Sequence, residues 1–227
     1  MKNVIYNDIN EAVFCEIELL RKELKKNKNI VKGYDFGKNK IIEKPISQIA
    51  LNAAKNKKYC RLLYRIVKWK NPKTSIEIGT SLGLSTLYIS KAIEPKSKLF
   101  TLEGNKSIAE IAFSNLKKLN ATNTEIIQGN FDDTIKPLID KITEIDLVFF
   151  DGNHHYQPTI NYFEICLQKA SPNAIFVFDD INWSADMQKA WRTIKSHHLV
   201  NLTLDLYFFG IVFLGDRITK ENFVVRF

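Results

Sequence analysis

The chain has 227 residues, of which 45% are hydrophobic and 26% charged, and its formal net charge is +8. These fractions are ordinary for a globular protein and exclude a disordered or fibrous chain. The length suits one α/β domain with an N-terminal elaboration and excludes two full domains of ordinary size. We expect the chain to fold alone or as a simple oligomer such as a homodimer.

The sequence also bears on compartment and partners. The longest apolar stretch, residues 206–214, is far shorter than the roughly 20 residues of a membrane span, and the N-terminus lacks the pattern of a secretory signal. Cys15, Cys60 and Cys166 are widely spaced among apolar residues, which favours reduced core thiols in a cytoplasmic protein. The positive charge is concentrated in residues 22–73, away from the motifs described below, which argues against nucleic acid as the partner.

The N-terminal third has the pattern of a helical cap. A first helix is indicated by a capping box and an apolar face: Asp8, Glu11, Ile9, Val13, Ile17, Leu20 and Leu24. A Lys/Asn-rich connector, residues 25–44, leads to a second helical stretch at residues 46–69. We assign residues 1–72 to an N-terminal cap that is part of the same domain as residues 73–227.

From residue 74 on, short apolar runs alternate with helical periodicity, which is the signature of βα units in a parallel sheet. The predicted strands are 75–78, 99–103, 125–128, 146–151, 174–179 and 202–207. Helix faces are predicted around 108–119, 160–170 and 187–194, the last with Ser184 as its N-cap. The last strand-like segments, 202–208, 210–214 and 223–227, have no helix between them, so we expect an antiparallel hairpin to close the sheet.

The first predicted strand runs into the turn Glu77-Ile78-Gly79-Thr80-Ser81-Leu82-Gly83-Leu84-Ser85, and a helix begins near Leu84. Two glycines at a strand-to-helix turn let the chain bend sharply and let a ligand lie against the backbone. The spacing is not that of a dinucleotide fingerprint, because Thr86 stands where a third glycine would fall, and there is no Walker lysine. The Glu77 carboxylate would repel a pyrophosphate, whereas it would attract the positively charged amino group and sulfonium of a cationic ligand.

Two further strand ends carry groups that suit an adenosine. Glu103 and Gly104 lie at the end of the second strand, where a Rossmann-like domain places the acceptor for a ribose hydroxyl. Gly129 and Asn130 end the third strand with a close-approach glycine and an amide. Together these residues favour an adenosine-type ligand. The alternative is that they are ordinary turn residues of a scaffold.

The run from Glu77 to Ser85 resembles the first motif of class I S-adenosylmethionine-dependent methyltransferases, in particular the small-molecule O-methyltransferases related to catechol O-methyltransferase. The segments Asp151-Gly152-Asn153-His154 and Phe178-Asp179-Asp180-Ile181-Asn182-Trp183 are similar to those of bacterial members of this group. The resemblance covers residues 74–227. It implies a Rossmann-like α/β fold, with a seven-stranded, mostly parallel sheet whose last strand is antiparallel.

The resemblance also implies S-adenosylmethionine as the cofactor and gives roles to the strand-end residues. The methionine moiety is expected near Glu77, Gly79, Ser81, Gly83 and Ser85, the ribose at Glu103 and the adenine at Asn130. Thr80, Gly104, Gly129 and Asp151 complete the expected cofactor-binding set.

Methyl transfer from a sulfonium is an in-line displacement, so a hydroxyl acceptor must be positioned and made nucleophilic by a general base or a divalent metal. Asp151 and Asp179 follow neighbouring strands at the edge where a parallel sheet binds ligands, whereas Asp180 reaches the same site only if the chain turns there. In cation-dependent relatives Asp, Asp and Asn hold the metal at positions matching Asp151, Asp179 and Asp180. The third is Asp here, which leaves three alternatives open: a Mg²⁺ or Ca²⁺ site, a site that works without metal, and a capping role for Asp180.

The expected catalytic residues are His154 and Asp151. His154 matches the position of the catalytic lysine in catechol O-methyltransferase, which implies a general base, although it could instead contact the cofactor or order its loop. Trp183 is a candidate wall of the acceptor pocket.

The leading interpretation is transfer of a methyl group to a small-molecule acceptor, most simply a hydroxyl oxygen, with no membrane partner. The alternatives are an RNA-modifying methyltransferase, a nucleotide-binding dehydrogenase and a non-catalytic adenosine-binding module. Asp151-Gly152-Asn153-His154 departs from the Asn/Asp-Pro-Pro-Tyr motif of base-amino methyltransferases, and the missing third glycine disfavours the dehydrogenase.

Overall fold

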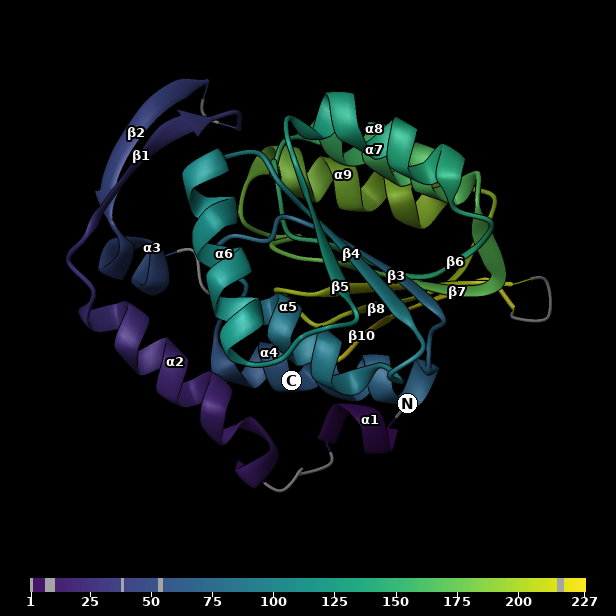
Figure 1. The fold of residues 1–227 in the computed structure, drawn as a ribbon. Helices are drawn as coiled ribbons and strands as arrows, with labels where there is room; N and C mark the ends of the chain where they lie inside the picture. Colours follow the sequence, from purple (N-terminus) through teal and green to yellow (C-terminus); the bar gives the residue numbers. More distant parts are fainter. Residues whose placement is uncertain (1, 7–10, 38, 53–54, 216–218) are drawn as a thin grey trace.

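One sheet of eight strands forms the centre of the computed structural model, which describes residues 2–6, 11–37, 39–52, 55–215 and 219–227 (Figure 1). Its strands are β3 (Thr74–Ile78), β4 (Lys98–Glu103), β5 (Thr124–Gln128), β6 (Ile145–Phe150), β7 (Ala170–Phe178), β8 (Val200–Asp205), β9 (Gly210–Leu214) and β10 (Glu221–Val224). They lie in the order β10-β8-β9-β7-β6-β3-β4-β5, and β9 is antiparallel to both β7 and β8. The ends of β3, β4, β5, β6 and β7 therefore meet at one edge.

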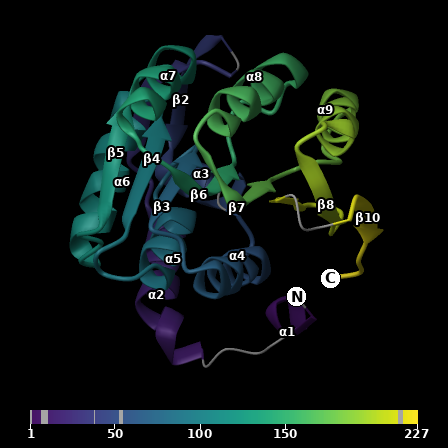
Figure 2. The same ribbon diagram turned by 90° about the vertical axis from the view of Figure 1, so that its right-hand side faces the viewer.

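Helices cover both faces of this sheet, so nearly all residues of its central strands β3 and β6 are buried. The helices after β3 are α5 (Leu84–Ala92), α6 (Lys106–Lys118), α7 (Phe131–Lys141), α8 (Tyr156–Leu167) and α9 (Ala185–Ser196). Along β6, Val148 and Phe150 pack in the core beneath α7, α8 and α9, while Leu147 and Phe149 pack in the core on the opposite face. Figure 2 shows these two helical layers on either side of the sheet.

The predicted Rossmann-like, mostly parallel sheet is confirmed, and each predicted strand coincides with an observed one to within a few residues. Ser184 caps α9 as expected, because its side chain accepts from the Met187 N–H at 3.1 Å. The strand number differs from the expected seven, since β10 adds an eighth strand that runs parallel to β8. Helix α7 also lies where no helix was predicted.

The N-terminal region contains helices α1 (Lys2–Tyr6), α2 (Cys15–Lys26), α3 (Ile46–Asn52) and α4 (Lys57–Lys70), and a short 3₁₀ helix, Glu11–Phe14. The expectation of a purely helical cap was wrong, because strands β1 (Ile30–Asp35) and β2 (Lys40–Pro45) form an antiparallel hairpin in the segment predicted as a connector. The expected second helix is divided into α3 and α4, and Asn56 caps α4 by accepting from the Lys58 N–H at 2.9 Å. The capping box of Asp8 and Glu11, and Ile9 beside it, lie outside the side chains that the structure describes.

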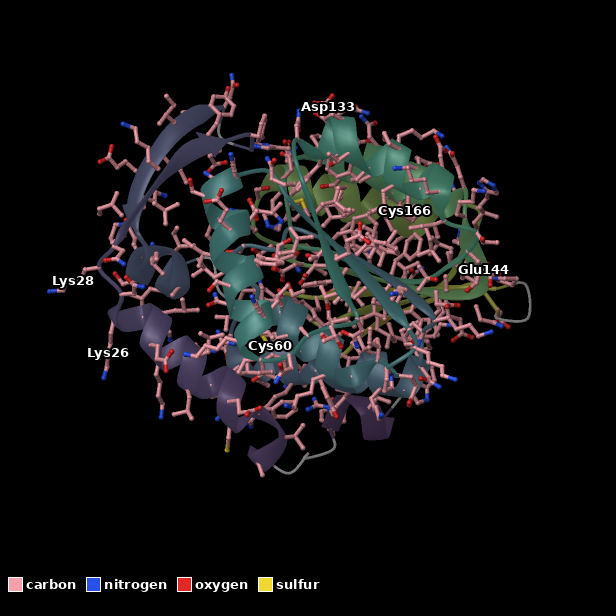
Figure 3. The ribbon with its side chains drawn as sticks, viewed as in Figure 1. Lys26, Lys28, Cys60, Asp133, Glu144 and Cys166 are labelled. Atoms are coloured by element: carbon pink, nitrogen blue, oxygen red, sulfur yellow. The ribbon has the colours of Figure 1, made fainter. Side chains whose placement is uncertain are left out.

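Two further sequence expectations concern the surface and the thiols. Within the described ranges, none of the helices combines the length and the apolar composition required to cross a membrane. Cys60 and Cys166 are buried as predicted, and both lie inside the molecule in Figure 3, whereas Cys15 is exposed. Lys26 and Lys28 point away from the protein body, as solvated lysines do (Figure 3).

Candidate functional site

The turn between β3 and α5 is held against two neighbouring strands. Gly79 has φ +106°, and a Cβ there would lie 2.7 Å from the carbonyl carbon of Asp151, so only glycine fits. The Gly79 and Thr80 N–H groups both donate to the Leu102 carbonyl at 3.0 Å. Gly83, with φ +82°, is the N-cap of α5. This geometry brings the turn, the end of β4 and the end of β6 into one place.

Glu103 lies at the end of β4, where both of its carboxylate oxygens receive backbone hydrogen bonds. The Ser81 N–H donates to Oε2 at 2.8 Å, and the Asn105 N–H donates to Oε1 at 2.9 Å. Burial raises the pKa of Glu103 to about 7, although these hydrogen bonds favour the charged form. The carboxylate therefore fixes the turn against β4 and titrates close to neutral pH.

A cavity of about 180 Å³ opens beside Gly79 and Glu103. We call it the first cavity, and it is lined by Tyr34, Asp35, Phe36, Gly37, Ile42, Gly79, Ser81, Glu103, Gly104, Asn105, Ile108, Asn130, Phe131, Asp151, Gly152 and Asn153. Predicted cofactor-binding residues from four separate strand ends, those of β3, β4, β5 and β6, thus line one cavity. The cavity has the mixed polar and aromatic lining that an adenosine-type ligand requires.

The other predicted cofactor-binding residues lie behind this wall or beside it. Glu77 is completely buried, and its Oε2 accepts from the hydroxyls of Thr86 at 2.5 Å and Thr101 at 2.7 Å. Burial raises the pKa of Glu77 to about 7 against these hydrogen bonds and one from Ser85. Thr80, Gly83, Ser85 and Gly129 likewise do not line the first cavity. In this structure Glu77, Thr80, Gly83 and Ser85 belong to the strand, turn and helix that surround Gly79, and Gly129 follows β5.

Asn130 has a structural role in addition to its place on the cavity wall. Its side-chain oxygen accepts from the Asp132 N–H at 3.4 Å and caps α7. Phe131, the first residue of α7, lines the cavity next to it. The helix that the sequence did not reveal therefore presents both an amide and an aromatic ring to the first cavity.

The β1–β2 hairpin forms the wall opposite the strand ends and was missed at the sequence level. Its Tyr34 and Phe36 line the first cavity, and the Phe36 ring lies so close to Gly104 that a Cβ on that glycine would be 2.9 Å from Cδ2 of the ring. The hairpin is attached to the start of α6, because Ser107 Oγ donates to the Lys32 carbonyl at 2.9 Å. In Figure 1 the hairpin lies beside α6, at the N-terminal, purple end of the colour scale.

Three carboxylates meet at the ends of β6 and β7. Asp151 follows β6 and Asp179 follows β7, where its side chain is completely buried. Asp180 has φ +54°, so the turn that it needs to reach the same site is present. Burial and the neighbouring Asp179 carboxylate raise the pKa of Asp151 well above its ordinary value.

A cation that the sequence analysis overlooked contacts this acidic cluster. Lys55, between α3 and α4, forms an ion pair with Asp179 Oδ2, and its Nζ lies 3.4 Å from Asp180 Oδ1. Burial alone would lower the pKa of this ammonium, but the carboxylates of Asp151, Asp179 and Asp180 outweigh burial and raise the pKa above its ordinary value. Lys55 is therefore a charged member of the site.

His154 lies at the junction of the acidic cluster and a second hollow. Its Nε2 is 3.7 Å from Asp151 Oδ1, and burial lowers the pKa of the imidazole against the attraction of Asp179 and Asp180. The second cavity, of about 470 Å³, is lined by Gly37, His154, His155, Trp183, Ser184, Ala185 and Asp186. Gly37 lines both cavities, and Trp183 stands 74% exposed at the second one.

The acidic cluster can be assessed as a metal site from its donor atoms. Asp151, His154 and Asp179 each present one ligand atom, and these atoms lie within 4.8 Å of one another. Two carboxylates and an imidazole are ligands that divalent metals accept. The Lys55 ammonium, however, already contacts Asp179 Oδ2, so a divalent cation at this cluster would lie close to a second positive charge. The metal set of Asp151, Asp179 and Asp180 stays a prediction.

Comparison with known proteins gives a consistent picture. Residues 76–181 match the model of a methyltransferase domain. Over 126 residues the chain is 27% identical to a catechol O-methyltransferase of Niastella koreensis, a match that covers 55% of either chain. It is 28% identical over 137 residues to a catechol O-methyltransferase of Mycobacterium tuberculosis, covering 60% of this chain and 59% of the relative. The chain thus spans little more than half the length of these relatives.

The fold is shared with solved O-methyltransferases. A Bacillus cereus O-methyltransferase, solved in complex with SAH, superposes with a TM-score of 0.68 at 18% identity, over 95% of this chain and 96% of that one. The Streptomyces achromogenes O-methyltransferase TomG, solved in complex with SAM, gives 0.62 at 23% identity, over 72% and 82%. Residues 76–181 thus resemble a methyltransferase domain, the sequence is similar to catechol O-methyltransferases, and the fold is the one seen in solved O-methyltransferases.

Proposed function

We propose that the chain transfers a methyl group from S-adenosylmethionine to a hydroxyl oxygen of a small molecule. The observation that carries the proposal is the arrangement of two cavities that meet at Gly37, with Asp151 on the first and His154 on the second. A donor in one cavity and an acceptor in the other would meet where these two side chains lie. Catechol O-methyltransferases among the relatives, and SAM or SAH in the related structures, support this choice of cofactor and acceptor.

The first cavity suits the adenosine part of the cofactor. Glu103 provides a carboxylate for ribose hydroxyls, although those hydroxyls must share it with the Ser81 and Asn105 N–H groups. Phe36 and Phe131 provide aromatic surface for the adenine. The carboxylates of the acidic cluster complement the positive charge of the sulfonium.

The reaction then needs one proton acceptor. The acceptor oxygen attacks the methyl carbon, the carbon–sulfur bond breaks, and its electron pair stays on sulfur to give the thioether product. His154 takes the hydroxyl proton, because its neutral imidazole lines the acceptor cavity. Asp151, 3.7 Å away, stabilises the imidazolium that forms.

The test separates binding from chemistry. Calorimetry measures S-adenosylmethionine affinity, and mass spectrometry follows the methylation of catechol. A parallel assay offers RNA as the methyl acceptor. We expect catechol to be methylated, and we expect His154→Ala to keep its cofactor affinity and lose about 100-fold or more of its turnover, as removal of a general base does. The exposed His198 gives the matched control, His198→Ala. Absence of cofactor binding would refute the proposal, and full activity of His154→Ala would remove the assigned base.

A further inference from the structure

The acidic cluster concentrates negative charge in a place with little access to water. The side chains of Asp179, Asp151 and Asp180 are 0%, 14% and 22% exposed. Asp179 Oδ1 has no hydrogen-bond partner among the residues that the structure describes. Buried carboxylates are costly unless a cation lies beside them. A positive charge beside the cluster therefore stabilises it.

Lys55 provides this positive charge from within the chain. Its side chain is 14% exposed and contacts Asp179 and Asp180 together. The left-handed backbone of Asp180 turns that carboxylate toward the same ammonium. Lys55 thus pairs with both carboxylates that directly follow β7.

The backbone of Lys55 is anchored independently of its ammonium. Arg21 Nη1 donates to the Lys55 carbonyl at 2.9 Å, and this buried arginine is itself paired with Glu18 at 3.2 Å. Helix α4 begins directly after its cap at Asn56. Because the Lys55 carbonyl and the following helix cap are held in place, its ammonium enters the cluster from a constrained position and loses less entropy on pairing than a flexible surface lysine.

A bound ion and this ammonium exclude each other. A small divalent cation approaches a carboxylate oxygen to about 2.0–2.6 Å, and an ion bound by either oxygen of Asp179 would lie close to the ammonium that contacts Oδ2. Two cations this close repel strongly in a site with little water. One of them must leave, and Lys55 is part of the chain and present at every ion concentration.

We propose that the Lys55 ammonium is the resident cation of the Asp151, Asp179 and Asp180 cluster and replaces a divalent metal there. Lys55 is a positioning residue: it holds the carboxylates of Asp179 and Asp180, which follow β7, in place beside His154. This inference rests on the proposed function for its catalytic consequence, which is that methyl transfer proceeds without added metal. The other part of the inference, that Lys55 excludes a metal ion from the cluster, can be tested without any enzymatic activity.

Mn²⁺, titrated by electron paramagnetic resonance, is the probe. We expect the wild-type protein to show no binding at the cluster, and Lys55→Gln to gain a site in the range of weak carboxylate sites, about 0.1–1 mM. That site should be lost in the double variant Lys55→Gln/Asp179→Asn. Lys55→Arg keeps a cation and should again exclude Mn²⁺. The matched control is Lys68→Gln, which removes a lysine from an exposed pair with Glu94 and should bind no more Mn²⁺ than the wild-type protein.

Each outcome decides the proposal. Mn²⁺ binding to the wild-type protein that disappears in Asp179→Asn would overturn it, and this measurement needs no change at Lys55. A folded Lys55→Gln that binds no Mn²⁺ would also overturn it, because the lysine would then not stand in for an ion; thermal melting confirms the fold. If the wild-type enzyme is active, chelation with EDTA should change its rate less than twofold, and a loss that Mg²⁺ restores would contradict the catalytic part. An inactive enzyme that excludes Mn²⁺ would refute the proposed function alone.

Discussion

The sheet and the N-terminal region supply the site in different ways. The sheet contributes residues at consecutive strand ends, and backbone contacts fix their positions, as where Gly79 lies against the Asp151 carbonyl. The N-terminal region contributes one hairpin wall and one side chain, Tyr34 and Phe36 on the first cavity and Lys55 in the acidic cluster. Substitutions in the two regions should therefore have effects of different size and kind.

The difference separates a shared framework from the parts that adjust it. The strand-end residues follow from the order of β3, β4, β5, β6 and β7, which is part of the fold itself. The hairpin and Lys55 depend on how one segment docks on the finished sheet, through contacts such as Ser107 to the Lys32 carbonyl. Substitution of a strand-end residue should reduce both stability and ligand binding. Substitution in the hairpin or at Lys55 should change only ligand binding or the charge of the acidic cluster.

The largest expected effect tests the framework. Gly79→Val forces a Cβ to within 2.7 Å of the Asp151 carbonyl carbon in a backbone conformation with φ +106°. We expect a loss of about 2–4 kcal/mol in the free energy of unfolding, measured by urea denaturation, together with loss of measurable cofactor affinity. Gly83→Ala is the matched control, because it adds a positive-φ penalty with only ordinary contacts of 3.6 Å to Ala112. Its cost should be about 1–2 kcal/mol; equal losses in the two variants would mean that strain, and not the clash, sets the effect.

A smaller effect is expected at Glu103, where the framework meets the ligand. Glu103→Gln should weaken S-adenosylmethionine binding about 10- to 100-fold, because a hydrogen bond to a charged group contributes roughly 1.5–3 kcal/mol. The raised pKa of about 7 adds a pH dependence. The ribose hydroxyls need the deprotonated carboxylate, so wild-type affinity should fall as the pH drops below about 7, whereas the affinity of Glu103→Gln should change little.

Calorimetry from pH 5.5 to pH 8.5 measures both parts of this prediction, with the range chosen to bracket the pKa of about 7. A flat wild-type profile, or a Glu103→Gln profile with the same slope as the wild type, would show that another group controls binding.

The raised pKa of Glu103 also affects the pH dependence of stability. A raised carboxyl pKa stabilises the folded state below the unfolded pKa, and this contribution is lost as the pH rises through about 7.

Much of the framework could be predicted from the sequence because its signals are local. The alternation of apolar runs with helical periodicity located the strands, and the glycine spacing after Glu77 located the turn. Since parallel strands end at one edge, Asp151 and Asp179 could be expected to meet, and they lie in one cluster. Which of the predicted residues reach the cavity was not predictable, because Ser81 lines it whereas Glu77 in β3 and Ser85 in α5 do not, and the motif gives no sign of this difference.

The N-terminal contributions carry no comparable signal. The hairpin is Lys-rich, and of its strand residues only Val31 and Ile42 are buried. The positions of β1 alternate in exposure, but the residues at them do not alternate between apolar and polar, so the sequence shows no strand pattern. Lys55 is one of many lysines in a basic segment, and its role depends on contacts with residues more than 120 positions away. Three clustered carboxylates favour a positive charge beside them, but the sequence does not indicate which of the many lysines provides it.

The smallest expected effect tests whether the hairpin takes part in binding. Phe36→Ala removes an aromatic wall of the first cavity that rests against Gly104, and should weaken S-adenosylmethionine binding about 3- to 10-fold, in line with the roughly 0.5–1.5 kcal/mol of an aromatic contact. Its stability should change little, because Phe36 is 43% exposed. Ile41→Ala on the same hairpin is the control, since Ile41 is 68% exposed and does not line the cavity. If both variants bind S-adenosylmethionine as tightly as the wild-type protein in calorimetry, the hairpin covers the cavity without contacting the cofactor. If both variants weaken binding equally, the hairpin acts through its docking on α6 and not through the Phe36 ring.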